Sequence, residues 1–216
     1  QKEGDRMSTD EKKSKSKLKN YAYTVAFILV VSIVFTAILA AANAAALPMI
    51  EENALLAERR AILDVFALDT TGSAPEVFSR FDQSIRTVEA GELTLYAQVD
   101  SGGKVLGYAV PFAGPGLWGI IEGYLGISPD HTKILGLVFT QQNETPGLGG
   151  RIEEPIFRDQ FRGLPIQPGQ DLAFGTSSGQ EIDAVTGATS TSNAVLKILN
   201  QLLDETVSQL EVMSGE

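Results

Sequence analysis

The chain contains no cysteine and only one histidine among its 216 residues. Without cysteine it has no disulfide, no thiolate metal site and no cysteine nucleophile. A histidine metal centre or a Ser-His-Asp triad would have to use His131 alone. His131 lies in the polar run Ser128–Lys133, which is typical of a solvated turn between two strands. We therefore predict no metal site and no catalytic residue, and any redox chemistry would need a cofactor that requires neither side chain.

Basic residues are scarce beyond position 20. Residues 1–20 hold seven Lys/Arg and four Asp/Glu, whereas the rest of the chain holds ten basic and twenty-three acidic residues. An acidic body of this kind argues against nucleic acid as a partner. Residues 1–20 are predicted to be a flexible basic tail. Because a Met stands at position 7, residues 1–6 are interpreted as an upstream extension and set aside in the fold prediction.

Charge is absent from residues 21–50, which are mostly Val, Ile, Leu, Phe and Ala. About 20 apolar residues span a bilayer as a helix, so residues 21–46 are predicted to be a transmembrane helix. The alternative is a signal peptide cleaved at Ala42–Ala44, but the apolar run exceeds the length of a signal sequence. A pilin-type processing site, with a Gly before an apolar run that carries an early Glu, is missing. Lysines before the span and Glu51 and Glu52 after it place the N-terminus in the cytoplasm and the body on the other side.

The remaining pattern predicts an α+β domain with a mixed or antiparallel sheet and flanking helices, preceded by the single transmembrane helix. Pro48 is predicted to end or kink that helix. Residues 47–72 form a juxtamembrane segment, in which the amphipathic helix Glu51–Leu68 continues the stalk or covers the body. The domain itself, residues 73–216, opens with a helix capped at Ser73. Further predicted elements are strands at Leu93–Val99, Val105–Phe112, Ile120–Ile127, Ile134–Thr140 and Glu181–Asp183, and a short helix at Glu154–Phe161 that buries Phe157 and Phe161.

Two glycine-rich loops interrupt the strand series. Gly114–Gly119 carries the only tryptophan, Trp118. The indole is either a core residue or a surface for a planar ligand, and the local pattern alone favours the core. Gln141–Arg151 contains Leu148, which we expect to be exposed. It is either a plain turn or, given its length, a binding loop, because glycine permits close approach of a ligand.

The stretch Asp183–Ser192 contains five hydroxyl residues directly before a helix-periodic run at residues 194–203. Serine and threonine oxygens commonly cap the free N–H groups of a helix N-terminus. The same N–H groups can also bind a phosphate. The local pattern favours a capped helix, and a phosphate site is the alternative.

Three of these segments resemble the FMN-binding domain family shared by the C subunit of the sodium-pumping NADH:quinone oxidoreductase (Nqr) and the G subunit of Rnf complexes. The family motif Asp-x-x-(Ser/Thr)-Gly-Ala-Thr is matched by Asp183, Thr186, Gly187, Ala188 and Thr189. A second motif, Glu-Thr-Pro-Gly-Leu-Gly, is present at Glu144–Gly149, and a third, Gly-Leu-Trp, at Gly116–Trp118. The resemblance runs from about Phe78 to Leu203, and the single anchor also fits.

The resemblance implies a covalent FMN, joined to Thr189 through a phosphoester that a separate flavin transferase installs. A phosphoester could also form, on chemical grounds, at the hydroxyls of Thr186, Ser190, Thr191 and Ser192. Only the resemblance singles out Thr189. It also implies that Asp183 serves transferase recognition or holds the loop, that Trp118 lies beside the flavin ring, and that Glu144 fixes its own loop. The cofactor-binding residues implied in this way are Thr189, Asp183, Thr186, Gly187, Ala188, Ser190, Leu117, Trp118, Glu144, Thr145 and Leu148.

The implied function is an electron-carrier subunit of an Nqr- or Rnf-type ion-translocating complex in a bacterial or archaeal cell membrane. Its partners would be the other subunits, the flavin transferase and membrane lipid, and it would have no complete active site of its own. The Gly-Leu-Trp-Gly loop and residues 149–155 resemble the Nqr type, whereas the short segment after the anchor resembles the Rnf type. The alternative is a membrane-anchored, non-redox ligand-binding or scaffold module.

Overall fold

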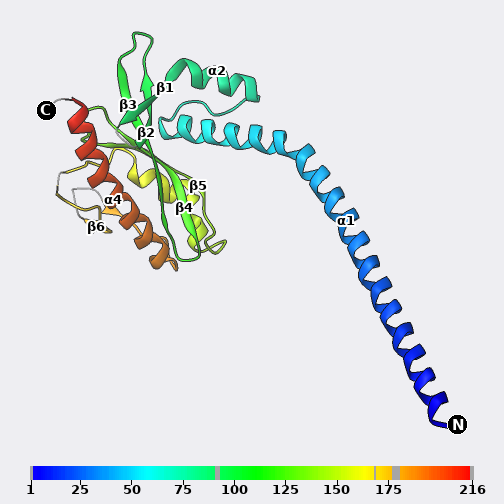
Figure 1. The fold of residues 1–216 in the computed structure, drawn as a ribbon. Coiled ribbons are helices and arrows are strands. Elements are labelled where there is room, and N and C mark those ends of the chain that lie inside the picture. Colours follow the sequence, from blue (N-terminus) through cyan, green and yellow to red (C-terminus); the bar gives the residue numbers. More distant parts are fainter. Residues whose placement is uncertain (1, 91–92, 168, 177–180, 215–216) are drawn as a thin grey trace. The chain divides into compact units, whose positions relative to one another are not determined.

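The computed structural model describes residues 2–90, 93–167, 169–176 and 181–214 (Figure 1). The chain divides into two compact units, Gln1–Asn53 and Ala54–Glu216, each described here by itself. Helix α1 (Lys2–Val65) runs through both. The other elements, all in the second unit, are α2 (Ala74–Ser84), β1 (Ile85–Ala90), β2 (Leu93–Val99), β3 (Val105–Pro115), β4 (Ile120–Ile127), β5 (Ile134–Gln141), η1 (Gly149–Glu153), α3 (Pro155–Arg158), η2 (Asp159–Phe161), β6 (Gly175–Thr176), β7 (Glu181–Ile182) and α4 (Thr189–Ser214).

The first unit is helical throughout its described part. From Asn20 onward, α1 contains a stretch long and apolar enough to cross a membrane, with a mean hydropathy of 2.8 and no buried residue. One expectation was wrong: the basic segment is helical from Lys2 rather than a flexible tail, because no Gly or Pro interrupts residues 5–20. Pro48 was expected to end or kink the helix. It lies inside α1 and does not end it, since one lost hydrogen bond does not stop a helix that is long on both sides, and the kink stays a prediction.

The end of α1 is a Schellman turn with an alanine where glycine is usual. The Leu68 N–H donates to the Leu63 carbonyl at 3.0 Å, and the Ala67 N–H donates to the Asp64 carbonyl at 2.9 Å. Between them Ala67 has a φ of 53°, in the left-handed region. An L-residue has a steric cost in this region that glycine lacks.

We expect Ala67→Gly to raise the free energy of unfolding of the second unit by about 1 kcal/mol, because it removes this steric cost. The matched control is Ala57→Gly, at an exposed position inside the same helix, which should lower stability by about 1 kcal/mol. Urea unfolding followed by near-ultraviolet circular dichroism measures both variants. A loss of stability in Ala67→Gly would contradict the assignment of the turn.

Strands β1 to β5 form one antiparallel sheet in sequence order, with β6 and β7 in a separate two-stranded ladder. The predicted α+β class with an antiparallel sheet is confirmed, and so are the bounds of β2 and β4. Strand β3 runs three residues beyond the predicted Phe112, and β5 one residue beyond Thr140. Strand β1 was missed, although its β-branched residues Ile85, Thr87 and Val88 are typical of a strand.

Both faces of the sheet are covered. On one face α4 lies across the strands (Figure 1), and Leu125, Leu137 and Leu199 belong to the core between them. On the other face the last turns of α1 pack with α2 in a second core, where Ile62 and Val65 are fully buried. The amphipathic helix that was predicted to continue the stalk or to cover the body therefore covers it.

A polar link also joins α1 to the sheet. One oxygen of the Glu58 carboxylate accepts the hydroxyls of Tyr96 at 2.9 Å and Tyr124 at 3.1 Å. Burial, together with the charge of Glu58, raises the pKa of Tyr124 above its ordinary value. Burial also raises the pKa of Tyr96, so both hydroxyls remain protonated donors to Glu58 at neutral pH.

Candidate functional site

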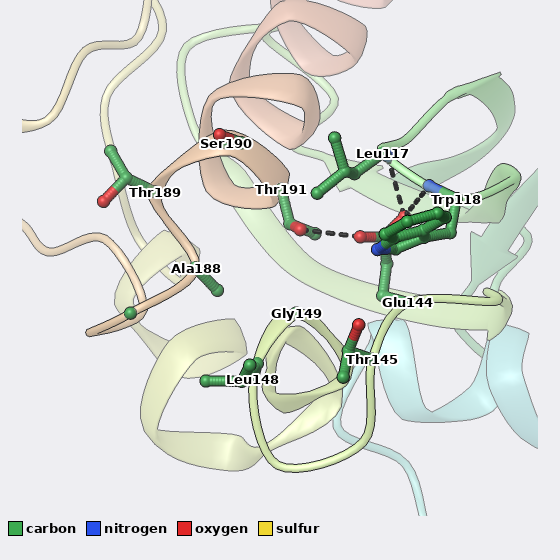
Figure 2. A pocket seen from close by; sticks show the side chains of 11 residues that line it. Leu117, Trp118, Glu144, Thr145, Leu148, Gly149, Ala188, Thr189, Ser190 and Thr191 are labelled. Carbon is green, nitrogen blue, oxygen red and sulfur yellow. Dashed lines mark hydrogen bonds between the residues drawn. The ribbon is translucent and has the colours of Figure 1, made fainter.

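The loops that carry the sequence motifs meet because of the strand order. Strands β3 and β5 flank β4 and both pair with it antiparallel, so they run in the same direction and end at the same edge of the sheet. The loop after β3 and the loop after β5 therefore open side by side. Together with the start of α4 they enclose a pocket of about 360 Å³. Its lining residues are Leu117, Trp118, Glu144, Thr145, Leu148, Gly149, Gly187, Ala188, Thr189, Ser190 and Thr191 (Figure 2).

Nine of the eleven residues singled out from the sequence line this pocket; Asp183 and Thr186 do not. Those two line a second pocket of about 370 Å³, together with Arg151, Glu154, Ile156, Phe157, Gln160, Ala184 and Val185. Gly187 separates the two groups, with a φ of 81° that turns the chain between Thr186 and Ala188. The motif therefore faces two pockets rather than one.

The segment before α4 is held by its backbone. The side-chain amide of Gln160 accepts the Asp183 N–H at 2.7 Å and donates to the Asp183 carbonyl at 3.3 Å. The Ser192 hydroxyl accepts the Val185 N–H at 3.0 Å and donates to the Ala188 carbonyl at 3.1 Å. Within the described part of the chain, no hydrogen bond to the Asp183 carboxylate is found. The segment is thus positioned by Gln160 and Ser192.

The structure also sorts the hydroxyl groups of the motif. Those of Thr191 and Ser192 are buried and hydrogen-bonded, whereas the side chains of Thr186, Thr189 and Ser190 are exposed. Of these three, only Thr189 and Ser190 line the first pocket. The local sequence alone did not distinguish among these five hydroxyl groups.

The expected hydroxyl cap of α4 was wrong in its position. Helix α4 begins at Thr189, and the residue before it is Ala188, which has no side-chain oxygen. Ser192 instead bonds within the preceding loop. Helix geometry then leaves the N–H groups of Thr189, Ser190 and Thr191 without intrahelical acceptors, and they lie at the edge of the pocket.

Trp118 is 69 % exposed, so the core position that the local pattern favoured is wrong, and the alternative, a surface open to a planar ligand, agrees with the structure. The Gly116 N–H donates to the Gly119 carbonyl at 2.7 Å, which closes a tight turn beyond the end of β3. The indole projects from this turn. Leu117 and Leu148 are exposed as well, and Figure 2 shows Leu117 and Trp118 at one end of the pocket and Thr189 at the other. The pocket thus has exposed apolar side chains at one end and the Thr189 hydroxyl at the other.

Glu144 is the buried charge of the site, with 4 % of its surface exposed. Its Oε1 accepts the N–H groups of Leu117 at 2.8 Å and Trp118 at 3.0 Å. Its Oε2 accepts the Thr191 hydroxyl at 2.6 Å. Sequence analysis did not select Thr191 or Gly149 as lining residues. Gly149 ends the Glu-Thr-Pro-Gly-Leu-Gly motif and Thr191 lies two residues beyond the motif that ends at Thr189, but only the docking of α4 against the β5 loop reveals their contact with Glu144.

Residues 116–204, which contain the whole pocket, match the sequence model of the FMN-binding domain family. The resemblance drawn from the motifs is thereby confirmed.

Two relatives represent the two kinds of complex. The chain is 37 % identical over 115 residues to the C subunit of the Na⁺-translocating NADH-quinone reductase of Pasteurella multocida, covering 50 % of this chain and 44 % of the relative. It is 40 % identical over 114 residues to the G subunit of the ion-translocating oxidoreductase complex of Methanosarcina acetivorans, covering 53 % of this chain and 58 % of the relative. The chain thus matches about half the length of these curated relatives.

The fold has a counterpart among solved structures. The crystal structure of NqrC from Shewanella oneidensis superposes with a TM-score of 0.63 at 20 % sequence identity, covering 73 % of this chain and 96 % of that one. At this identity the likeness concerns the fold, and it agrees with the α+β domain described above.

Proposed function

We propose that the chain is a covalent-FMN electron-carrier subunit of a membrane-bound, ion-translocating redox complex. The observation that supports this most is the convergence of three motif segments, far apart in sequence, on one pocket. The relatives named above, one from each kind of complex, favour the same function.

The residues of the pocket fit FMN. Trp118, Leu117 and Leu148 offer exposed apolar surface to a planar ring. The N–H groups at the start of α4 offer donors to a phosphate, whose charge the helix dipole also favours. Among the described residues that line the pocket none is basic, so these N–H groups would carry the phosphate charge. When bound, FMN supplies the capacity to accept and donate electrons, which no side chain of this site offers.

The attachment point we propose is Thr189. Its hydroxyl is exposed, lines the pocket and stands in the first turn of α4, beside the N–H groups that would receive the phosphate. Ser190 meets the same geometric conditions, and the family motif favours Thr189. Asp183 and Thr186 face the second pocket, which supports a role in recognition by the flavin transferase rather than in contact with the ring.

The membrane arrangement is part of the proposal. The apolar stretch of α1 anchors the chain, with the lysines before it in the cytoplasm and the FMN-binding domain on the opposite side. The basic residues flanking the span support this orientation. Electrons would then reach the domain from one neighbouring subunit and leave to another.

Purification of the membrane complex from its native host tests the proposal. We expect an intact mass greater than that of the chain by one FMN less one water, and flavin absorbance that persists after denaturation. Subunits that co-purify decide between an Nqr-type and an Rnf-type complex. A colourless, unmodified chain from that host would contradict the proposal and favour a non-redox scaffold module.

A further inference from the structure

We propose that Glu144 is a positioning residue that locks the Trp118 loop to the start of α4. Its carboxylate bonds to both walls of the pocket at once: to the N–H groups of Leu117 and Trp118 through Oε1, and to the Thr191 hydroxyl through Oε2 (Figure 2). The lock is a property of the chain itself. Its effect on the cofactor rests on the function proposed above.

Two glycines provide the space that this carboxylate occupies. A Cβ atom at Gly116 would lie 2.5 Å from Glu144 Oε1. A Cβ atom at Gly149 would lie 2.9 Å from Glu144 Oε2 and 2.6 Å from the Thr191 hydroxyl oxygen. Neither glycine has a positive φ, so backbone freedom does not explain them. They are needed because any larger residue would displace the carboxylate or the hydroxyl that it accepts.

The Glu144 carboxylate suits this contact because all three partners donate to it. An ionised carboxylate has two oxygens and no proton, so it can accept three donors that lie on two sides of it. The backbone of Glu144 is itself fixed, because its N–H donates to the Gln142 side-chain oxygen at 2.6 Å. The carboxylate thus projects from a defined position into the gap between the two walls.

The indole of Trp118 depends on this contact because little else holds it. Most of its surface is exposed, so packing contributes little to its position. The backbone N–H groups of Trp118 and Leu117 donate to the Glu144 carboxylate. The same carboxylate accepts the hydroxyl of Thr191, two residues after Thr189. Glu144 therefore sets the separation between the aromatic end of the pocket and its hydroxyl end.

Fluorescence of the flavin-free, full-length chain in detergent tests the lock directly, because Trp118 is the only tryptophan. We expect Glu144→Ala to lower the anisotropy of the indole emission and to raise its quenching by acrylamide. Thr191→Val keeps the side-chain shape but removes the hydroxyl, and should shift both readouts in the same direction by less. Thr191→Ser retains the hydroxyl and should match the parent chain.

Three controls separate positioning from general damage. Leu125→Ala in the core of β4 should lower stability and leave the anisotropy unchanged. The double variant Glu144→Ala/Thr191→Val should lose no more anisotropy than Glu144→Ala alone, since both changes remove the same bond. Near-ultraviolet circular dichroism verifies that each variant is folded.

Anisotropy in folded Glu144→Ala and Thr191→Val equal to that of the parent chain would overturn the proposal. In the flavin-loaded chain, we expect the same two variants to lose part of the quenching of Trp118 by flavin. If the parent chain carries no flavin at all, the proposed function fails, while the flavin-free measurement still decides the role of Glu144.

Discussion

Thr189→Ala should abolish covalent flavin attachment completely. The substitution removes the one hydroxyl that satisfies three conditions at once: it is exposed, it lines the pocket, and it occupies the last position of the family motif. The proposed phosphoester needs this oxygen, and a methyl group cannot replace it. In-gel flavin fluorescence of the chain, produced together with a flavin transferase, should be lost, and the intact mass should return to that of the bare chain.

Ser190→Ala is the matched control, since Ser190 is the neighbouring hydroxyl that lines the same pocket. It should retain full fluorescence. Ser192→Ala tests the support of the loop instead. The Ser192 hydroxyl bonds to both Val185 and Ala188, so its loss should reduce the efficiency of attachment without moving the attachment site. Fluorescence that persists in Thr189→Ala and disappears in Ser190→Ala would move the attachment to Ser190.

Gly149→Ala should destabilise the domain by about 1–3 kcal/mol, the usual cost of overpacking a closed site. The added Cβ would lie 2.6 Å from the Thr191 hydroxyl and 2.9 Å from Glu144, and both groups are buried and bonded to each other. To make room, that hydrogen bond must open. We therefore expect a lower urea midpoint and, in the same variant, reduced flavin loading.

Gly150→Ala is its matched control within the same short helix, η1. There the nearest atom to an added Cβ is the Gln142 side-chain nitrogen at 3.4 Å, which is ordinary contact. Both alanines change backbone entropy in the same way, so the difference between the two variants isolates the clash. Equal stabilities would mean that the region around Glu144 relaxes at little cost.

Much of the fold follows from local pattern. Strand β2 was predicted to the residue because its apolar and polar positions alternate, and β4 because it forms a hairpin with β5 around the polar turn at His131. The start of α2 was predicted because Ser73 precedes an early Pro and Glu76, which form a helix N-terminus. The prediction missed strand β1, because this strand directly follows α2 and its apolar and polar residues alternate over only a few positions. Local sequence signals did not predict that the basic segment is helical or that α1 continues through Pro48. Both features depend on the length of the whole helix.

The sequence predicted most of the residues that line the site, but not how these residues are arranged in space. Sequence motifs identified nine lining residues, but no pattern could tell that Asp183 and Thr186 face a different pocket, since that depends on the turn at Gly187. The local pattern also favoured a core position for Trp118, because tryptophan is highly buried on average, and only the family resemblance pointed to a ligand surface. Thr191 could not be separated from its neighbours, since its bond to Glu144 exists only once α4 has docked.

The order of the strands in the sheet affects the stage of folding at which the proposed flavin attachment becomes possible. Strands β1 to β5 each pair with the strand made just before, so the sheet can assemble from contacts that are local in the chain. The pocket closes only when α4, which follows the strands in the sequence, packs against that finished sheet. An incomplete chain therefore presents Thr189 on an unanchored segment, far from the Trp118 loop. Attached flavin would then mark molecules that have completed folding, and its presence could serve as a measure of maturation yield.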